Sequence, residues 1–285
     1  MTENMPVIYL TSNIRTEEKK ILAELVKAGL KYEHIDVRKK VFNRDLEHGL
    51  DGCVVFNRCM SQTQSLACIR YYESMGLRCI NSSKTISLCG DKQAMTMALQ
   101  AAHIPTPQAV FALDRNSALK AIQEIGFPVV IKPSTGSWGR LVVRAHNMDS
   151  AEAILDLRQH LTGPQHRLHY IQKYIDTKNQ DIRVIMIDND IVAAYRRVSD
   201  HWITNAARGA KGVRMHICSE LERICRATSH VAGGGVLSID LFDTEDGGFL
   251  VNEVNHTSEF ALAGDVTNIN IAEYVVEYLR EHVSL

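Results

Sequence analysis

The sequence lacks an excess of charge of either sign, and it lacks long apolar runs. Its 285 residues include 32 Lys and Arg against 33 Asp and Glu, which gives a formal net charge of −1. A dedicated nucleic-acid binder needs a broad basic surface, so we expect no nucleic-acid partner. No apolar run approaches the roughly 18 residues of a membrane span, so we expect no membrane segment. The first ten residues do not resemble a secretory leader, and we therefore expect a cytoplasmic protein.

The sequence also lacks the usual cysteine and glycine motifs. None of its seven cysteines forms a C-x-x-C pair, and an odd number is a poor disulfide framework, so we expect free thiols. The first predicted strand is not followed by G-x-G-x-x-G, which argues against a dinucleotide-binding unit. The glycine-bearing turn at Gly136–Gly139 is not followed by Gly-Lys-Ser/Thr, so it is no Walker loop.

Hydrophobic patterning predicts an α/β protein. Short apolar strands alternate with helices over roughly the first 85 residues, which predicts a mostly parallel sheet. From residue 182 onward, apolar runs are joined by the turns Asp188-Asn189-Asp190 and Glu245–Gly248, which predicts antiparallel hairpins. We expect three units, namely a parallel α/β domain over 1–88, a small central lobe over 89–171 and a lobe with an antiparallel sheet over 172–285.

Three polar residues near the C-terminus lie on two predicted strands that pair with each other. Asp240 lies inside an apolar strand, and Glu253 and Asn255 end the next one, where a period of two puts both on one face. Hard oxygen ligands of this kind suit Mg²⁺, which takes one or two carboxylates, and they suit zinc poorly. The alternative is that Asp240 is merely hydrogen-bonded and Glu253 solvated, and the residues alone favour neither interpretation.

Lys132 ends an apolar strand and is followed, after Pro133, by the small-residue turn Ser134–Gly139. An ammonium group at this place, together with backbone N–H groups at Gly136 and Gly139, can hold a triphosphate. Taken alone the turn is a weak signal, because G-x-x-G also occurs in ordinary tight hairpins.

The order of several short motifs resembles the ATP-grasp ligases of the RimK type, and the resemblance spans nearly the whole chain. The motifs are Gly90-Asp91-Lys92, Ile131-Lys132-Pro133, Gln172-Lys173-Tyr174-Ile175, Asp181-Ile182-Arg183, Asn205 with Arg208-Gly209, Asp240, and Glu253-Val254-Asn255. Within this group, four blocks are most similar to the LysX and ArgX family of lysine and arginine biosynthesis, namely Asn57–Gln62, Gly136–Leu141, His201–Asn205 and Glu253–Thr257.

This resemblance implies an ATP-grasp fold and an amide-forming reaction. ATP would activate a carboxylate as an acylphosphate, and an amine would then displace phosphate. The implied nucleotide-binding residues are Lys92, Lys132, Ser137, Gln172, Lys173, Tyr174 and Ile175, and the implied ligands of two Mg²⁺ ions are Asp240, Glu253 and Asn255. The implied catalytic residues are Arg183 and Lys132, and the implied substrate-binding residues are Arg196, Asn205, Arg208, Asn255 and Thr257.

The resemblance further implies the two substrates. The carboxylate would be the C-terminal glutamate of a small acidic carrier protein of the LysW type, and five basic residues against one acidic residue between Arg196 and Arg214 could attract it. The amine would come from an acidic amino acid, either 2-aminoadipate or glutamate. The chain departs from the family at Ala206 and Ala210, usually Thr and Gly, and at Ala261, usually Lys, so the amino acid stays open.

Two rival functions remain on the sequence alone. One is a RimK-like ligase that adds glutamate to another protein or peptide, and the other is a non-catalytic nucleotide-binding protein with the same fold. We also expect the chain to form a homo-oligomer.

Overall fold

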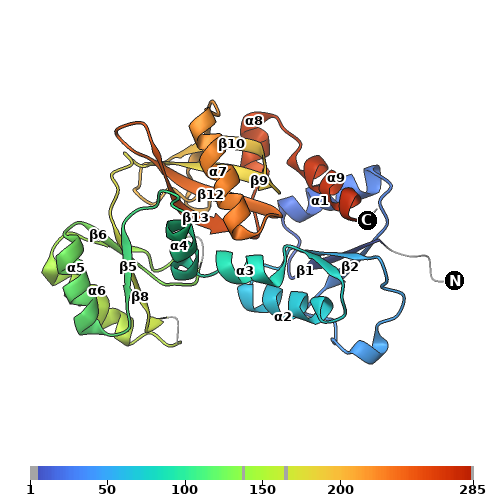
Figure 1. Ribbon diagram of the computed structural model, residues 1–285, viewed down its shortest axis with the longest axis horizontal. Coiled ribbons are helices and arrows are strands. Elements are labelled where there is room, and N and C mark those ends of the chain that lie inside the picture. Colours follow the sequence, from blue (N-terminus) through green and yellow to red (C-terminus); the bar gives the residue numbers. More distant parts are fainter. Residues whose placement is uncertain (1–5, 137–138, 164–165, 284–285) are drawn as a thin grey trace.

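The computed structural model describes residues 6–136, 139–163 and 166–283, and three sheets divide this part of the chain into three regions (Figure 1). The N-terminal sheet has the strand order β2-β1-β3-β4, and every pairing in it is parallel, as the alternating pattern predicts. Its strands are β1 (Val7–Thr11), β2 (Tyr32–Asp36), β3 (Val54–Asn57) and β4 (Arg78–Ile80), and its helices are α1 (Thr16–Lys27), α2 (Gln62–Glu73) and α3 (Ser83–Cys89), with a short 3-10 helix η1 (Arg44–Leu46).

The central lobe contains a four-stranded sheet of order β5-β8-β6-β7. All its pairings are antiparallel, so antiparallel structure begins earlier in the chain than the hairpin signals suggested. Its strands are β5 (Ala109–Ala112), β6 (Val129–Lys132), β7 (Val143–Ala145) and β8 (His169–Lys173), and α5 (Arg115–Ile125) and α6 (Met148–Gln159) pack against them. This lobe lies apart from the rest at the lower left of Figure 1.

The third sheet has the order β11-β10-β9-β12-β13 and is antiparallel throughout, which confirms the hairpins predicted from the two turns. Its strands are β9 (Gln180–Ile187), β10 (Asp190–Val198), β11 (Lys211–Arg214), β12 (Val236–Asp243) and β13 (Phe249–Asn255). The helices of this region are α4 (Lys92–Ala101), η3 (Ala206–Arg208), α7 (Ser219–Ala232), α8 (Ala261–Thr267) and α9 (Ile271–Val283).

The hydrophobic cores show which parts of the molecule are packed together. One core joins β1, β3 and α1 to β9, β10 and α9, so the N-terminal domain and the third sheet share buried surface. The central lobe has a core of its own around Ala118, Ile122 and Leu155. A cleft between the central lobe and the rest of the molecule is therefore the natural place for a site that closes on a ligand.

Two elements cross the boundaries expected from the sequence. Helix α4 lies within the segment 89–171, but its Met95 and Leu99 are buried in one core with residues of the third sheet. Strand β8 runs across the boundary after residue 171 and belongs to the central sheet.

Other features agree with the composition. All seven cysteines are free thiols. Within the described ranges, no helix is long and apolar enough to cross a membrane.

Candidate active site

Two cavities meet at the edge of the third sheet. The first, of about 800 Å³, lies between the central lobe and the third sheet. The second, of about 710 Å³, lies between the third sheet and the N-terminal domain. Arg197, Asn205, Asp240 and Glu253 line both cavities. A molecule bound in the first cavity can therefore reach one bound in the second at these four side chains.

The pairing of β12 with β13 brings the predicted oxygen ligands together. Asp240 lies directly opposite Glu253, and Asn255 lines the second cavity beside them. Asp240 is buried and Glu253 is half-buried. The sequence-based expectation that Glu253 and Asn255 share a face agrees with this placement.

Asp240 is also part of a buried ion cluster. The Arg183 Nε and Nη2 donate to its two carboxylate oxygens at 2.7 and 2.8 Å, and Arg197 lies 3.0 Å from it. Arg197 in turn makes a two-pronged ion pair with buried Asp181. Burial alone would raise the pKa of the Asp240 carboxyl, but the two guanidinium groups outweigh it and lower that pKa to about 2. Asp240 is therefore an anion at any physiological pH.

The neighbouring arginines of β10 face opposite ways. Arg197 lines both cavities, whereas Arg196, predicted to bind substrate, pairs with Asp243 and lies outside the residues that line them. The strand register explains this, because Arg197 lies opposite Asp181 and Arg196 lies opposite Ile182. Arg197 is not among the site residues predicted from the sequence. Its position two residues after Tyr195, which lies opposite Arg183, could have indicated it once the pairing of β9 with β10 was known.

Two lysines lie beside these carboxylates in the first cavity, Lys132 from the central lobe and Lys92 from the start of α4. Lys132 is buried at the end of β6, and its Nζ donates to Asn252 Oδ1 at 3.0 Å. The Lys92 Nζ lies 3.2 Å from Glu253 and donates to the Gly136 carbonyl at 2.7 Å. Ammonium groups and carboxylates thus converge on one cavity. Asn252, which also accepts from Gln172 at 3.4 Å, is a site residue that the sequence did not reveal.

The glycine-bearing turn reaches across the first cavity to the third region. At Gly139, with φ of +63°, a Cβ would come within 2.8 Å of the Asn205 and Ile203 side chains, so only glycine fits there. Arg208 is exposed and donates to the Gly139 carbonyl at 3.3 Å. Ser137, predicted to bind the nucleotide, lies outside the described residues. Asn205 and Arg208 thus both lie next to Gly139.

The segment Gln172–Ile175 lines the first cavity at the junction of the two lobes. The Lys173 ammonium donates to the Ile125, Gly126 and Phe127 carbonyls at 3.0 to 3.3 Å, and so it binds the end of α5. The backbone N–H groups of Lys173 and Tyr174 donate to Gln108 and Pro128 within the central sheet.

The second cavity is lined by Asn255, the last residue of β13, and by His256 and Thr257, which follow it. His256 Nδ1 lies 2.9 Å from Thr257 Oγ1. Burial, together with the Arg58 cation, lowers the pKa of His256 to about 4, so this imidazole is neutral near pH 7.

These features define a class of enzyme. A cleft between two antiparallel-sheet lobes holds two lysines and two paired carboxylates, and a second cavity opens at the carboxylates. Such a site holds a polyphosphate and brings its terminal phosphate to a second substrate, as in ATP-dependent ligases.

Comparison with known families agrees with this class. Residues 7–88 match the LysX preATP-grasp domain, and residues 89–279 match the RimK-like ATP-grasp domain. The chain belongs to the RimK-like ATP-grasp family, and it is an ATP-dependent, amide-bond-forming ligase.

Individual relatives are similar over almost their whole length. The chain is 34% identical to the alpha-aminoadipate--LysW ligase LysX of Saccharolobus solfataricus, over 94% of this chain and 98% of that one. It is 34% identical to the glutamate--LysW ligase ArgX of Sulfolobus acidocaldarius, over 98% of this chain and 99% of that one. In structure, it resembles the ATP-grasp ligase PsnB, solved with minimal precursor, Mg and ADP, with a TM-score of 0.76, 16% identity and 99% coverage of both chains.

ATP-grasp ligases use ATP with Mg²⁺, and the donor set of this site fits the metal. No group of three His, Cys, Asp or Glu side chains in the described ranges is arranged as a metal site. Asp240, Glu253 and Asn255 instead offer two carboxylates and one amide around the point where the two cavities meet. Mg²⁺ accepts such a set, because it takes one or two carboxylates and completes its shell with water and phosphate oxygens.

The ammonium of Lys132 predicts a pH dependence of ATP binding. Burial lowers its pKa to about 8, although Glu253 opposes the shift, and so the ammonium loses its proton just above neutral pH. We expect ATP to bind about tenfold more weakly at pH 9 than at pH 7, since a neutral amine attracts phosphate poorly. Titration calorimetry with ATP and Mg²⁺ across this range measures the change.

Lys132→Arg is the control for that titration. Arginine keeps its charge beyond pH 12, so the variant should bind ATP with nearly constant affinity between pH 7 and 9. An equal loss of affinity in the wild type and the variant would assign the pH dependence to another group.

Proposed function

We propose that this enzyme joins the C-terminal glutamate of a LysW-type carrier protein to the α-amino group of an acidic amino acid, 2-aminoadipate or glutamate, at the cost of ATP. The proposal is supported by the names of the relatives above and by one structural observation, which is that Asp240 and Glu253 line both cavities. A phosphate donor in the first cavity and an amine in the second would meet at these carboxylates.

The first step would transfer the γ-phosphoryl group of ATP to the carrier carboxylate. Lys92 and Lys132 would hold the phosphate tail, and residues Gln172–Ile175 would contact the adenine. Mg²⁺ ions, two by analogy with the family, would be held by Asp240, Glu253 and Asn255 and would neutralise charge on the phosphate oxygens. The products of this step are an acylphosphate and ADP.

The second step would be attack of the amine on the acylphosphate. Arg183 and Arg197 would stabilise the negative charge that develops on the tetrahedral carbon's oxygen, because both guanidinium groups are fixed by carboxylates before substrate arrives. The C–N bond forms, the C–O bond to phosphate breaks, and the amine loses a proton to water or phosphate. Asn205, Asn255 and Thr257 would line the amine's path.

The exposed basic residues would contact the carrier. Arg208, Lys211 and Arg214 are exposed, and Arg208 contacts the turn at Gly139, whereas Arg197 is buried and Arg196 pairs with Asp243. We therefore assign Arg208 to the carrier's acidic chain. Arg196, further from the cavities, would add to the same positive surface.

The test is ADP release by purified enzyme with ATP, Mg²⁺ and purified carrier across a panel of amino acids. We expect an acidic amino acid to accelerate release strongly only when the carrier is present. Release that depends on glutamate with another protein or peptide would favour the RimK-like alternative. Absence of release under every condition would favour a non-catalytic nucleotide-binding protein.

Carrier binding should weaken as salt rises, because the surface of Arg208, Lys211 and Arg214 is exposed and basic. We expect the Kd to rise several-fold between roughly 50 and 300 mM NaCl, and Lys211→Gln to reduce this slope. Lys120→Gln on α5, also exposed but on the central lobe, is the matched control. An affinity independent of salt would remove the electrostatic contribution.

A further inference from the structure

The N-terminal domain supplies one wall of the second cavity. Arg15, in the loop between β1 and α1, and Met60, after β3, line it opposite Arg183 and Arg197. Arg15 belongs to none of the motifs that carry the family resemblance. Its place suggests that this wall does more than close the cavity.

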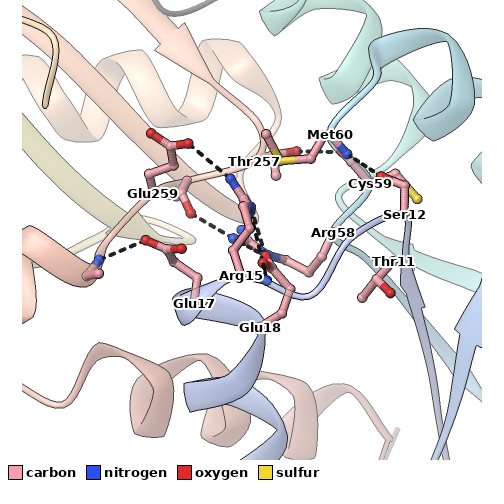
Figure 2. Close-up of polar contacts among 12 residues, drawn as sticks. Thr11, Ser12, Arg15, Glu17, Glu18, Arg58, Cys59, Met60, Thr257 and Glu259 are labelled. Atoms are coloured by element: carbon pink, nitrogen blue, oxygen red, sulfur yellow. Dashed lines mark hydrogen bonds and ion pairs between the residues drawn. The ribbon is translucent and has the colours of Figure 1, made fainter. Parts of the chain in front are cut away.

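One edge of the Arg15 guanidinium is bound by the carboxylate of Glu18. Its Nε and Nη2 donate to the two oxygens of Glu18 at 2.9 and 2.8 Å, and the Glu18 side chain is fully buried (Figure 2). The backbone N–H of Arg15 also donates to Glu18, at 3.0 Å. This contact fixes the plane and direction of the guanidinium before any substrate binds.

The other end of the guanidinium faces the cavity. Nη1 donates to Glu259 Oε1 at 3.0 Å, and the Glu259 side chain is 32% exposed. Figure 2 shows Glu259 approaching Arg15 from the side opposite Glu18. A half-exposed carboxylate on this end can be displaced by another carboxylate, whereas Glu18 cannot.

A buried arginine, Arg58, links the N-terminal domain to the loop that follows β13. Arg58 donates through Nε to Glu18 Oε1 at 3.0 Å and through Nη2 to the Ser258 carbonyl at 2.9 Å (Figure 2). Glu18 is thus shared by two guanidinium groups, and Glu259 supplies a second carboxylate to Arg15. A substrate carboxylate beside Arg15 would therefore take the place of Glu259.

The other arginines of the second cavity lie where it meets the first. Arg183 and Arg197 are buried in ion pairs with Asp240 and Asp181, at the junction where phosphate would be transferred. Arg15 lies on the opposite wall and is 22% exposed. A substrate carboxylate that must not react needs such a cation, away from the transferred phosphate.

We propose that Arg15 binds a carboxylate of the amino-acid substrate through the guanidinium end that Glu259 occupies in this structure. The inference rests on the proposed function. An arginine that is fixed by one buried carboxylate, and whose other end faces a cavity and holds a partly exposed one, is well suited to exchange the second for a substrate carboxylate. Anchored there, the amino acid would direct its amine across the cavity toward Asp240 and Arg183. The wall formed by the N-terminal domain thus selects an acidic substrate.

The first experiment measures steady-state kinetics of Arg15→Gln with purified carrier. We expect the KM for the amino acid to rise about 30-fold or more, because a charge-assisted hydrogen bond is lost. The KM values for ATP and for the carrier should stay within about twofold of wild type. Arg15→Lys keeps the charge but not the planar donors, and its KM for the amino acid should lie between those of the wild type and Arg15→Gln.

Arg223→Gln is the matched control. Arg223 makes the same kind of contact, with Nε and Nη2 on the two oxygens of Glu220 at 2.9 and 2.8 Å, but on an exposed face of α7 outside both cavities. It should leave every KM unchanged. A KM for the carrier that rises in Arg15→Gln while that for the amino acid stays constant would overturn the proposal.

Exchange of isotope within ATP, measured with carrier but without amino acid, separates this proposal from the proposed function. Scrambling of the β,γ-bridging oxygen reports acylphosphate formation, and Arg15→Gln should scramble at the wild-type rate, which also shows that the variant is folded. Loss of scrambling in Arg15→Gln alone would overturn the role of Arg15. Absence of carrier-dependent scrambling in the wild type would instead contradict the proposed function.

Amide analogues identify the carboxylate that Arg15 binds. Two analogues of the preferred amino acid are compared, one amidated at the α-carboxylate and one at the side-chain carboxylate. We expect one of them to lose about as much kcat/KM in the wild type as Arg15→Gln loses with the acid, and to lose nothing further in the variant. Independent losses for both analogues would show that neither carboxylate contacts Arg15.

Discussion

Glu253→Gln is expected to lower turnover by about a hundredfold or more while leaving the protein folded. Glu253 is half-buried, lines both cavities and lies opposite Asp240. Glu253 makes an ion pair with Lys92, at 3.2 Å, and an amide oxygen can still accept from that ammonium. The variant therefore loses the negative charge that would hold Mg²⁺ and keeps the local packing. The free energy of unfolding should change by less than about 1 kcal/mol.

The measurement is ADP formation at saturating substrates, together with urea unfolding of the same samples. Glu245→Gln is the matched control, because Glu245 is exposed in the turn of the same β12–β13 hairpin, outside both cavities. It should be as active and as stable as the wild type. Near-normal turnover of Glu253→Gln would show that this carboxylate does not support phosphoryl transfer.

Strand periodicity predicts part of this site and fails at one residue. It correctly puts Glu253 and Asn255 on one face, because the two residues lie two positions apart after the bulge in β13. Asn252 breaks the alternation, because the register shifts between Asp240 and Leu241, so that Glu253 and Val251 have partners on β12 and Asn252 does not. Such a bulge redirects a side chain, here toward Lys132, and nothing in the local sequence marks it.

The other residues of the two cavities are positioned by contacts between segments that are far apart in the sequence. Arg196 and Arg197 are equivalent in sequence, and only the register of β10 against β9 puts Arg197 beside Asp181. Arg15 and Glu259 are 244 positions apart and meet because the N-terminal domain and the third sheet share a core. Motif order could locate the phosphate side of the site, which is built from strand ends. It could not locate a wall that is assembled from two loops of different domains.

Asp240→Asn is expected to lose both activity and stability, unlike Glu253→Gln. The sequence presents the two carboxylates as equivalent metal ligands, but Asp240 also compensates two buried guanidinium groups, Arg183 and Arg197. Its replacement by an amide leaves Asp181 as the one carboxylate of that cluster, and an uncompensated buried charge remains. Breaking a buried pair in this way costs about 3–5 kcal/mol. Turnover should fall by at least about a hundredfold, as for Glu253→Gln.

Urea unfolding distinguishes this cost from the loss of a metal ligand. Asp243→Asn, three residues further along β12, is the matched control, because its ion pair with Arg196 is partly exposed and should contribute less than about 1 kcal/mol. The double variant Asp240→Asn with Arg183→Met removes one positive charge as well and should regain much of the lost stability without regaining turnover. If Asp240→Asn unfolds no more readily than Asp243→Asn, the cluster does not need this carboxylate. Asp240 would then contribute to binding of the metal and not to the stability of the protein.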